Sequence, residues 1–134
     1  MAGPLTGMRV MDFTRALAGP HCTMLLGDMG AEVIKIERVE GGDEVRRMGP
    51  PFIKGESAAF MASNRNKKSL TVNLKDPRGQ DICKRLAMQV DVLVENFRPG
   101  VMKGLGLDYT VLAALNPQLI YCSISGFGHT GPMS

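Results

Sequence analysis

Short apolar segments alternate with segments of helical pattern along the whole chain, and this alternation restricts the possible folds more than any other feature of the sequence. Residues 8–13 form a short apolar run that suits a buried strand, and residues 31–37 alternate as a second strand. Further strands are predicted at residues 69–74, 91–95 and 119–125. Strands that alternate with helices pair in parallel through right-handed crossovers. The predicted fold is therefore α/β, a Rossmann-like parallel sheet with flanking helices.

The helical segments carry start and stop signals of their own. Pro20 fits the first turn of a helix, and Gly30 fits the left-handed residue that ends it. Asp76 followed by Pro77 is a strong helix start, with the aspartate as N-cap and the proline at the first helical position. Asp108 caps another short helix. These helices fall between the predicted strands, as an α/β fold requires.

Ligands of open parallel sheets bind beyond the carboxyl ends of the strands, so the residues at those ends are the first candidates for a site. The predicted ends are residues 13–18, 37–38, 74–75, 95–98 and 125–128. Residues 38–57 are rich in glycine, proline and charge and are predicted as a long loop, which in a compact domain is usually functional or mobile.

Length, composition and charge exclude several classes of protein. A chain of 134 residues, 44% hydrophobic and 22% charged, fits one globular domain. A net charge of +3 is too small for a non-specific nucleic-acid binder, and no apolar run is long enough to cross a membrane. The absence of a signal-peptide pattern makes the cytoplasm the expected location. The three cysteines and two histidines lack metal spacing, so no metal site is expected and both residue types are interpreted as structural.

The first strand-to-helix turn, residues 14–20, matches a dinucleotide-binding fingerprint only weakly. Such a fingerprint is G-x-G-x-x-G, and Gly19 is the only glycine here. Glu37 does end the second strand, where an acidic ligand of a ribose would lie. A classical NAD or FAD site is therefore a minor alternative.

Three basic motifs are candidate phosphate or nucleotide contacts. Arg38 follows the second strand and could hold a phosphate with both arms of its guanidinium. Residues 64–69 (NRNKKS) are either a phosphate-facing loop or a polar turn with surface charges, and the pattern favours neither. In residues 96–100 (NFRPG), Phe97 and Arg98 could sandwich an adenine while Asn96 reads its edge; the alternative places Phe97 in the core.

Taken together, these segments resemble the opening of CoA-transferase family III, the group that contains formyl-CoA transferase, carnitine CoA-transferase and alpha-methylacyl-CoA racemase. The motifs that carry the resemblance are residues 4–38, 64–75, 91–109 and 119–132, in the family's order and spacing. The resemblance implies that residues 1–134 are the N-terminal part of a CoA-binding large domain. That part is incomplete relative to the full-length family fold, and two full-length subunits interlock as a homodimer.

The resemblance also implies a set of contacts with coenzyme A. Some members have a polar residue where this chain has Leu17. Some have a basic residue where this chain has Gly104, and here Lys103 is expected to take the place of that basic residue. The implied coenzyme A contacts are Leu17, Ala18, Arg38, Val72, Asn73, Leu74, Lys75, Asn96, Phe97, Arg98 and Lys103.

Transferases of this family use an aspartate that attacks the acyl-CoA thioester and forms a mixed anhydride. The resemblance places that aspartate beyond Ser134, so no catalytic residue is expected in this chain, and neither Asp12 nor Asp28 matches its position. Coenzyme A or acyl-CoA is then a substrate, a carboxylic acid is the other, and no prosthetic group is expected. Two alternatives stay open: an acyl-CoA racemase of the same fold, and a non-catalytic CoA-binding fragment.

Overall fold

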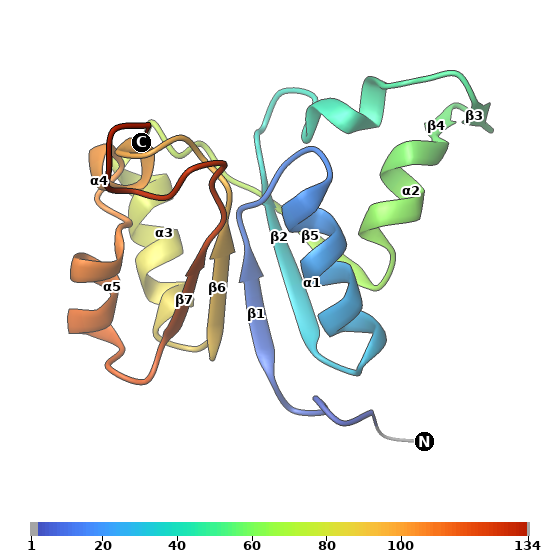
Figure 1. Ribbon diagram of the computed structural model, residues 1–134. Helices are drawn as coiled ribbons and strands as arrows, with labels where there is room; N and C mark the ends of the chain where they lie inside the picture. The colour runs from blue at the N-terminus through green and yellow to red at the C-terminus, as the bar shows by residue number, and fades with distance from the viewer. Residues whose placement is uncertain (1–2, 134) are drawn as a thin grey trace.

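Five parallel strands form the central sheet, in the spatial order β5–β2–β1–β6–β7 (Figure 1). The computed structural model describes residues 3–133. The strands are β1 (Arg9–Asp12), β2 (Glu32–Glu37), β5 (Lys67–Thr71), β6 (Val92–Glu95) and β7 (Ile120–Ser123). Every neighbouring pair in this sheet is parallel. The α/β fold predicted from the alternation of segments is therefore confirmed.

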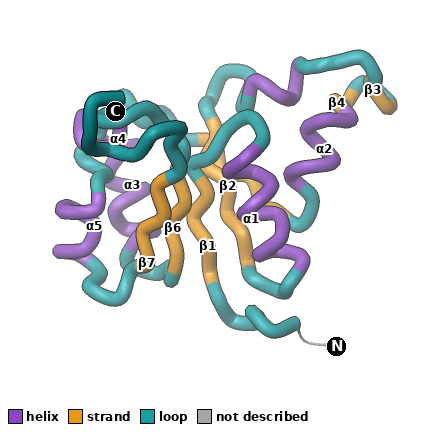
Figure 2. Tube along the Cα trace, viewed as in Figure 1, coloured by secondary structure: helices purple, strands orange, loops and turns teal. Residues whose placement is uncertain are grey.

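Helices cover both faces of the sheet (Figure 2). Helix α1 (Ala18–Asp28) lies on one face, whereas α3 (Pro77–Ala87) and α5 (Tyr109–Leu115) pack against each other on the opposite face. The short helix α4 (Val101–Gly104) follows β6. Within the described part of the chain, no helix has the length and apolar character that crossing a lipid bilayer would need.

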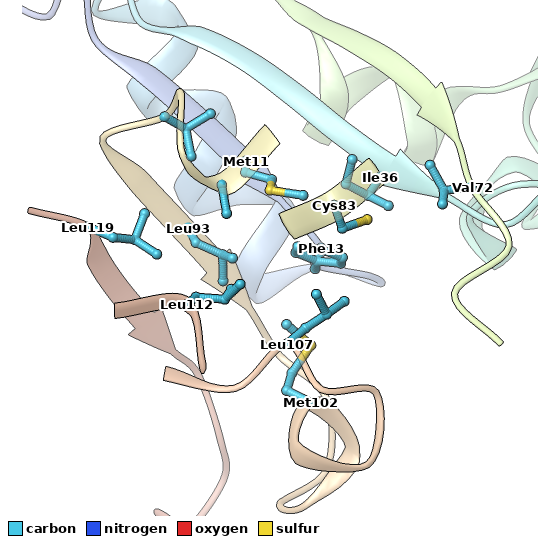
Figure 3. Packing of buried hydrophobic residues seen from close by; sticks show 12 residues of the cluster. Met11, Phe13, Ile36, Val72, Cys83, Leu93, Met102, Leu107, Leu112 and Leu119 are labelled. Atoms are coloured by element: carbon cyan, nitrogen blue, oxygen red, sulfur yellow. The ribbon is translucent and has the colours of Figure 1, made fainter. Parts of the chain in front are cut away.

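Each face of the sheet has its own hydrophobic core because successive residues of a strand point to opposite sides. Val10 of β1 faces α1 and packs with Leu26 of that helix. Met11, the next residue, faces the other way and belongs to the cluster that contains Cys83 of α3 and Leu112 of α5 (Figure 3). The strands are thus buried on both sides, which explains their nearly continuous apolar sequences.

The strand order reverses between β1 and β6. From β1 the chain proceeds through α1 to β2 and then to β5 at the edge of the sheet, before α3 returns it to the other side of β1, where β6 and β7 follow. All five carboxyl ends lie at one edge, hereafter the carboxyl edge. In open α/β sheets, the point at this edge where the order reverses is the usual place for a ligand.

Helix ends follow the sequence signals closely. Pro20 lies in the first turn of α1, and Gly30, with φ of 101°, follows its end in the left-handed region. The Asp76 side chain accepts a hydrogen bond from the Arg78 backbone N–H and so caps α3. Asp108 does occupy the N-cap position of α5, but its side chain makes no capping hydrogen bond.

The segment predicted as one long loop contains short elements of its own. A 3₁₀ helix η1 (Glu44–Arg47) is followed by a hairpin of β3 (Phe52–Ile53) and β4 (Glu56–Ser57). Helix α2 (Ala58–Asn64) begins there and was not predicted; its N-cap is Ser57, whose hydroxyl accepts from the Phe60 N–H. These elements are held by tertiary contacts, since α2 packs on α1.

The strand predicted at residues 69–74 begins and ends earlier in the structure than the sequence indicated. β5 covers Lys67–Thr71, and only the Val72 N–H continues the ladder, donating to the Glu37 carbonyl. The lysines that open β5 look like loop residues in the sequence. They pair with carboxylates of neighbouring elements and therefore remain compatible with a strand.

Candidate functional site

The turn after β1, residues 13–17 and hereafter the β1–α1 loop, starts from a buried carboxylate. One oxygen of Asp12 accepts from the Thr14 backbone N–H at 2.8 Å and from the Thr14 hydroxyl, and the other accepts from Thr23 at 2.7 Å and from Lys67 at 3.0 Å. Gly19 is required beside this turn, because an added Cβ would lie 2.3 Å from the Cβ of Thr14. The glycine thus has a packing role at the start of α1.

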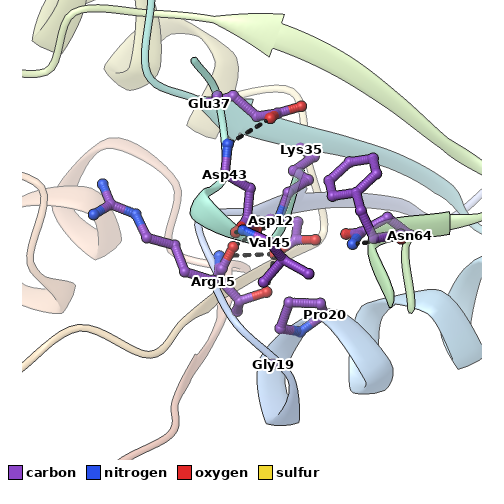
Figure 4. A network of polar contacts seen from close by, with 12 residues as sticks. Asp12, Arg15, Gly19, Pro20, Lys35, Glu37, Asp43, Val45 and Asn64 are labelled. Atoms are coloured by element: carbon purple, nitrogen blue, oxygen red, sulfur yellow. Dashed lines mark hydrogen bonds and ion pairs between the residues drawn. The ribbon is translucent and has the colours of Figure 1, made fainter. Parts of the chain in front are cut away.

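A second buried cation holds the same loop from the side of β2. The Lys35 ammonium donates to the Thr14 carbonyl at 2.7 Å and pairs with Asp43 at 2.9 Å (Figure 4). Both charged side chains are almost fully buried. Because unpaired buried charges are very costly, this pair fixes the β1–α1 loop relative to the chain that follows β2.

Glu37, at the end of β2, is saturated by donors from its own chain. One of its oxygens accepts from Arg46 and Ser69, and the other accepts from Arg46 and the Asp43 backbone N–H. Burial alone would raise the pKa of this carboxyl, but these donors outweigh it and lower the pKa from 4.5 to about 2. With two donors at each oxygen, the carboxylate is poorly placed to receive the hydroxyls of a ribose, which argues against the NAD or FAD alternative.

The structure resolves the ambiguity of the basic segment 64–69. Arg65 pairs with Asp28 at 2.6 Å, and Lys67 lies buried against Asp12. Lys68 pairs with an exposed glutamate of β2. Each cation of this segment has a carboxylate partner, so the segment is a polar turn leading into a strand and not a loop that faces a phosphate.

Several cations at the carboxyl edge have no carboxylate partner in the described part of the chain. Among the described residues, no carboxylate lies within ion-pair distance of Arg15, Lys75, Arg98 or Lys103. Arg38 makes a long contact, at 3.6 Å, with an exposed glutamate and donates to the Gly42 carbonyl at 3.1 Å. Burial, followed by repulsion from Arg38, lowers the pKa of the Arg15 guanidinium. Two like charges are therefore close together where β1 and β2 end.

A cleft of about 480 Å³ lies at the end of the sheet where β6 and β7 finish. Its lining combines three basic side chains with two tyrosines, whose rings meet edge to face with centroids 5.9 Å apart. These five residues are Arg98, Lys103, His129, Tyr109 and Tyr121. The carboxylates of Glu95 and Asp108 also line the cleft, which therefore offers two cations beside two carboxylates, and aromatic surface for a planar ligand.

Polar groups at the floor of this cleft are linked to each other. The Ser123 hydroxyl bonds to the buried carboxylate of Glu95 and lies 2.6 Å from the Nε2 atom of His129. Glu95 also accepts from the Phe97 backbone N–H at 2.8 Å. Burial, and then the charges of Glu95 and Asp108, raise the pKa of Tyr121, which stays a neutral hydroxyl.

The residues implied as coenzyme A contacts lie along the carboxyl edge but do not all face one cavity. Arg98 and Lys103 line the cleft. Leu17 and Ala18 are exposed at the start of α1, and Asn73 and Lys75 are exposed after β5. Arg38 is half-exposed after β2.

Four of the implied residues have side chains engaged within the protein. Val72 is buried in the core and Leu74 packs against it, so Val72 could meet a ligand only through its backbone. Phe97 also packs against this core, as the alternative interpretation predicted, and the Arg15 guanidinium lies 4.7 Å from its ring centre. Asn96 bonds to the Arg15 backbone through both ends of its amide.

Several residues at this edge were not singled out from the sequence. Arg15 lies in the turn just after the first strand and could have been recognised by its position, whereas Tyr109 and Tyr121 reach the cleft only through the packing of α5 and β7. His129 was interpreted as structural, yet it lines the cleft and contacts Ser123. In residues 3–133, no cluster of histidine, cysteine, aspartate or glutamate could hold a metal ion.

Known proteins share the sequence and the fold of this chain. Residues 5–134 match the family model described as CoA-transferase family III. The succinyl-CoA:glutarate CoA-transferase of Mus musculus is 56% identical over 98% of this chain and 30% of its own length. The succinate–glutarate CoA-transferase of Agrobacterium fabrum is 50% identical over 96% of this chain and 34% of its own length.

A solved structure agrees with this match. The crystal structure of a CAIB/BAIF family protein from Brucella suis superposes with a TM-score of 0.94 and 48% identity, over 98% of this chain and 36% of that protein. The chain thus spans about a third of the length of the relatives that it matches.

Proposed function

The chain belongs to CoA-transferase family III, and on that premise we propose that residues 1–134 form the N-terminal part of a coenzyme-A-binding large domain. The protein to which this domain belongs moves coenzyme A between an acyl-CoA and a carboxylic acid. Coenzyme A is its substrate and not a prosthetic group. The names of the mouse and Agrobacterium relatives, which specify succinyl-CoA or succinate and glutarate, support a donor and an acceptor of the dicarboxylic class.

One observation carries this proposal: cations without a close carboxylate partner gather at the carboxyl edge. Lys35, Arg46, Arg65 and Lys67 each have a carboxylate partner within 3.0 Å. In the described part of the chain, Arg15, Lys75, Arg98 and Lys103 have no carboxylate partner, and Arg38 has only a long contact with one. Arginine and lysine side chains without a close carboxylate partner, gathered where parallel strands end, suit the phosphates of coenzyme A.

The nucleotide end of coenzyme A would then lie along the carboxyl edge. Arg98 and Lys103 contact its phosphates at the cleft, and Arg38 faces the nucleotide from the other side of the switch point. The exposed Asn73 and Lys75 border the adenosine, with Val72 and Leu74 shaping the backbone beneath it. Leu17 and Ala18 contact the ligand at the start of α1.

The transfer itself requires a carboxylate nucleophile, which we place in residues that follow Ser134. The buried carboxylates of this chain at the edge are already engaged, Asp12 with Lys67 and Glu95 with Ser123. An aspartate that attacks the thioester carbonyl forms a mixed anhydride and expels coenzyme A as thiolate. The thiolate attacks the aspartyl carbonyl of the anhydride, which releases the donor acid and leaves an aspartyl-CoA thioester.

The second half of the reaction repeats these steps with the acceptor. Its carboxylate attacks the aspartyl thioester, expelling the thiolate and forming a new anhydride. The thiolate then attacks the acceptor carbonyl, which gives the new acyl-CoA and restores the aspartate. One difficult exchange is thereby divided into easier covalent steps.

The test uses the complete natural polypeptide that carries these residues. Calorimetry should detect coenzyme A binding, and succinyl-CoA with glutarate should yield glutaryl-CoA. Arg98→Glu should weaken coenzyme A binding by about 10- to 100-fold, the loss expected for one charged hydrogen bond. Arg85→Glu is the matched control, because Arg85 is also exposed and has no ion pair in residues 3–133 but lies on α3. Folded protein that gives no heat with coenzyme A, or equal losses in both variants, would contradict the proposal.

We also propose that the full-length subunits form an interlocked homodimer, as the family resemblance implies. Large apolar side chains remain exposed on the β3–β4 hairpin and on β7: Phe52 is 49% exposed, Ile53 55% and Ile120 60%. Apolar surface of this kind marks contacts with other protein elements. Light scattering of the purified full-length protein should give twice the subunit mass, and a stable monomer would reject the dimer.

A further inference from the structure

The β1–α1 loop is held across the switch point by one amide side chain of the neighbouring strand end. Oδ1 of Asn96 accepts from the Arg15 backbone N–H at 2.8 Å, and Nδ2 donates to the Arg15 carbonyl, also at 2.8 Å. A single side chain thus binds both polar backbone groups of one residue that lies 81 positions away in the sequence. Arg15 lies outside the β ladder, so this contact replaces the hydrogen bonds that a strand would supply.

The next residue explains why the loop needs such a contact. Ala16 has a φ of 62°, in the left-handed region that side chains with a Cβ rarely adopt. Residues in this conformation persist when their surroundings fix them. Thr14, on the other side of Arg15, is held by Asp12 and Lys35. The Asn96 amide completes this support immediately before the unfavourable residue.

The side chain of Arg15 adds a further contact to the same strand end. Its guanidinium lies over the ring of Phe97, 4.7 Å from the ring centre. Residues 96 and 97 together therefore hold Arg15 by its backbone and by its side chain. Leu17 and Ala18, which we place against coenzyme A, follow Arg15 by two and three residues and start α1 from this fixed point.

We propose that Asn96 is a positioning residue, which holds the β1–α1 loop in the conformation that presents Leu17 and Ala18 to coenzyme A. The link to the ligand rests on the proposed function, whereas the hold on the loop does not. An asparagine that instead reads the adenine directly would contribute affinity without depending on the conformation of Ala16.

The experiment compares Asn96→Ala with Asn116→Ala, which removes the same kind of contact between an amide side chain and the backbone elsewhere in the protein. Asn116 also clamps backbone with its amide, donating to the carbonyls of Ala87 and Val90 at 3.0 Å each, but it does so at the opposite end of the sheet. Hydrogen exchange of the loop amides should accelerate at least about tenfold in Asn96→Ala, as two lost hydrogen bonds imply, and should not change in Asn116→Ala.

Coenzyme A affinity, measured by calorimetry on the full-length protein, gives the second readout. It should fall about tenfold in Asn96→Ala and stay within about twofold in Asn116→Ala. Adding Ala16→Gly to Asn96→Ala should recover most of the lost affinity, because glycine adopts a positive φ without the clamp. A residue that contacts the ligand directly would not be rescued by this second substitution.

Each outcome of these measurements either supports or overturns the positioning role of Asn96. Unchanged loop exchange in Asn96→Ala, or lost affinity without rescue by Ala16→Gly, overturns the positioning role. If the wild-type protein gives no heat with coenzyme A, the proposed function fails, while hydrogen exchange still decides whether Asn96 holds the loop. Should Asn96→Ala not fold, Asn96→Asp is the second variant, because it keeps the hydrogen-bond acceptor and the shape of the side chain. Hydrogen exchange of the loop amides should accelerate in Asn96→Asp, but by less than the roughly tenfold expected for alanine. Unchanged exchange again overturns the proposal.

Discussion

Replacement of Glu37 by glutamine should lower the free energy of unfolding by an amount that depends on pH. Glu37 is buried at the end of β2 and is bound by Arg46, Ser69 and the backbone N–H of Asp43. Glutamine has the same shape but no charge, so it resembles the protonated carboxyl at every pH. The difference between the two proteins therefore reports what the ionised form contributes.

The magnitude follows from the pKa of Glu37. Burial opposes ionisation, but the three donors lower the pKa from 4.5 to about 2, which lies about 2.5 pH units below the unfolded value. At about 1.4 kcal/mol per pH unit this corresponds to about 3.4 kcal/mol at most. Because the Arg46 side chain is 32% exposed and partly screened by water, we expect about 2 kcal/mol.

The sign of the pH dependence is fixed by the lowered pKa. A carboxyl whose folded pKa is depressed stabilises the protein above its unfolded pKa, and this stabilisation is lost as the pH falls through the folded pKa. The difference between wild type and Glu37→Gln should be complete above about pH 5.5, fall to less than half near pH 3 and vanish near pH 2.

Urea denaturation followed by circular dichroism at pH 7, 5 and 3 measures this difference. Glu32→Gln is the control on the same strand, because Glu32 pairs with Lys68 and Arg9 at the exposed surface. Its effect should be much smaller at all three pH values. A difference for Glu37→Gln that is negligible at pH 7, or that is equal at pH 7 and pH 3, would refute the reasoning.

Two further predictions concern buried groups. Lys67→Met leaves the carboxylate of Asp12 buried without its cation and should lower the free energy of unfolding by about 3–5 kcal/mol, whereas adding Asp12→Asn should restore part of the loss in the same denaturation assay. Burial raises the pKa of the Cys83 thiol to about 12, so this thiol should react with a disulfide reagent at pH 8 only when the protein unfolds. The half-buried Cys122 should react faster in the native protein. Equal reaction rates for the two thiols would contradict the buried position of Cys83.

Elements that depend on local signals were predicted well. The strand predicted at residues 91–95 is found as β6, Val92–Glu95, because a short apolar run buried on both faces has few other options, and α3 begins at Pro77 because Asp76 caps it. Elements that depend on distant partners were not. Helix α2 packs on α1, and β5 begins at Lys67 because the charge of that lysine is buried against Asp12.

The candidate site shows the same division. Arg38 and Arg98 were singled out because each lies at or just beyond the end of an apolar strand, and strand ends meet at one edge of a parallel sheet. The sequence could not show that Lys67 and Lys68 are paired while Arg98 and Lys103 are not, since pairing depends on which carboxylates the fold brings near. The position of Tyr121 in the cleft is likewise invisible before β7 is placed beside β6.

The sequence by itself determined the α/β class, the edge at which the candidate site residues gather and the family resemblance, because periodicity and strand-end chemistry are local properties of the chain. Only the tertiary structure decided which side chains at that edge are free for a ligand and which serve the protein. Asn96 is the clearest case: it reads as a nucleotide contact in the sequence, yet its amide binds the Arg15 backbone. The reason is geometric, since a side chain's hydrogen-bond partners are set by distances between residues far apart in the sequence.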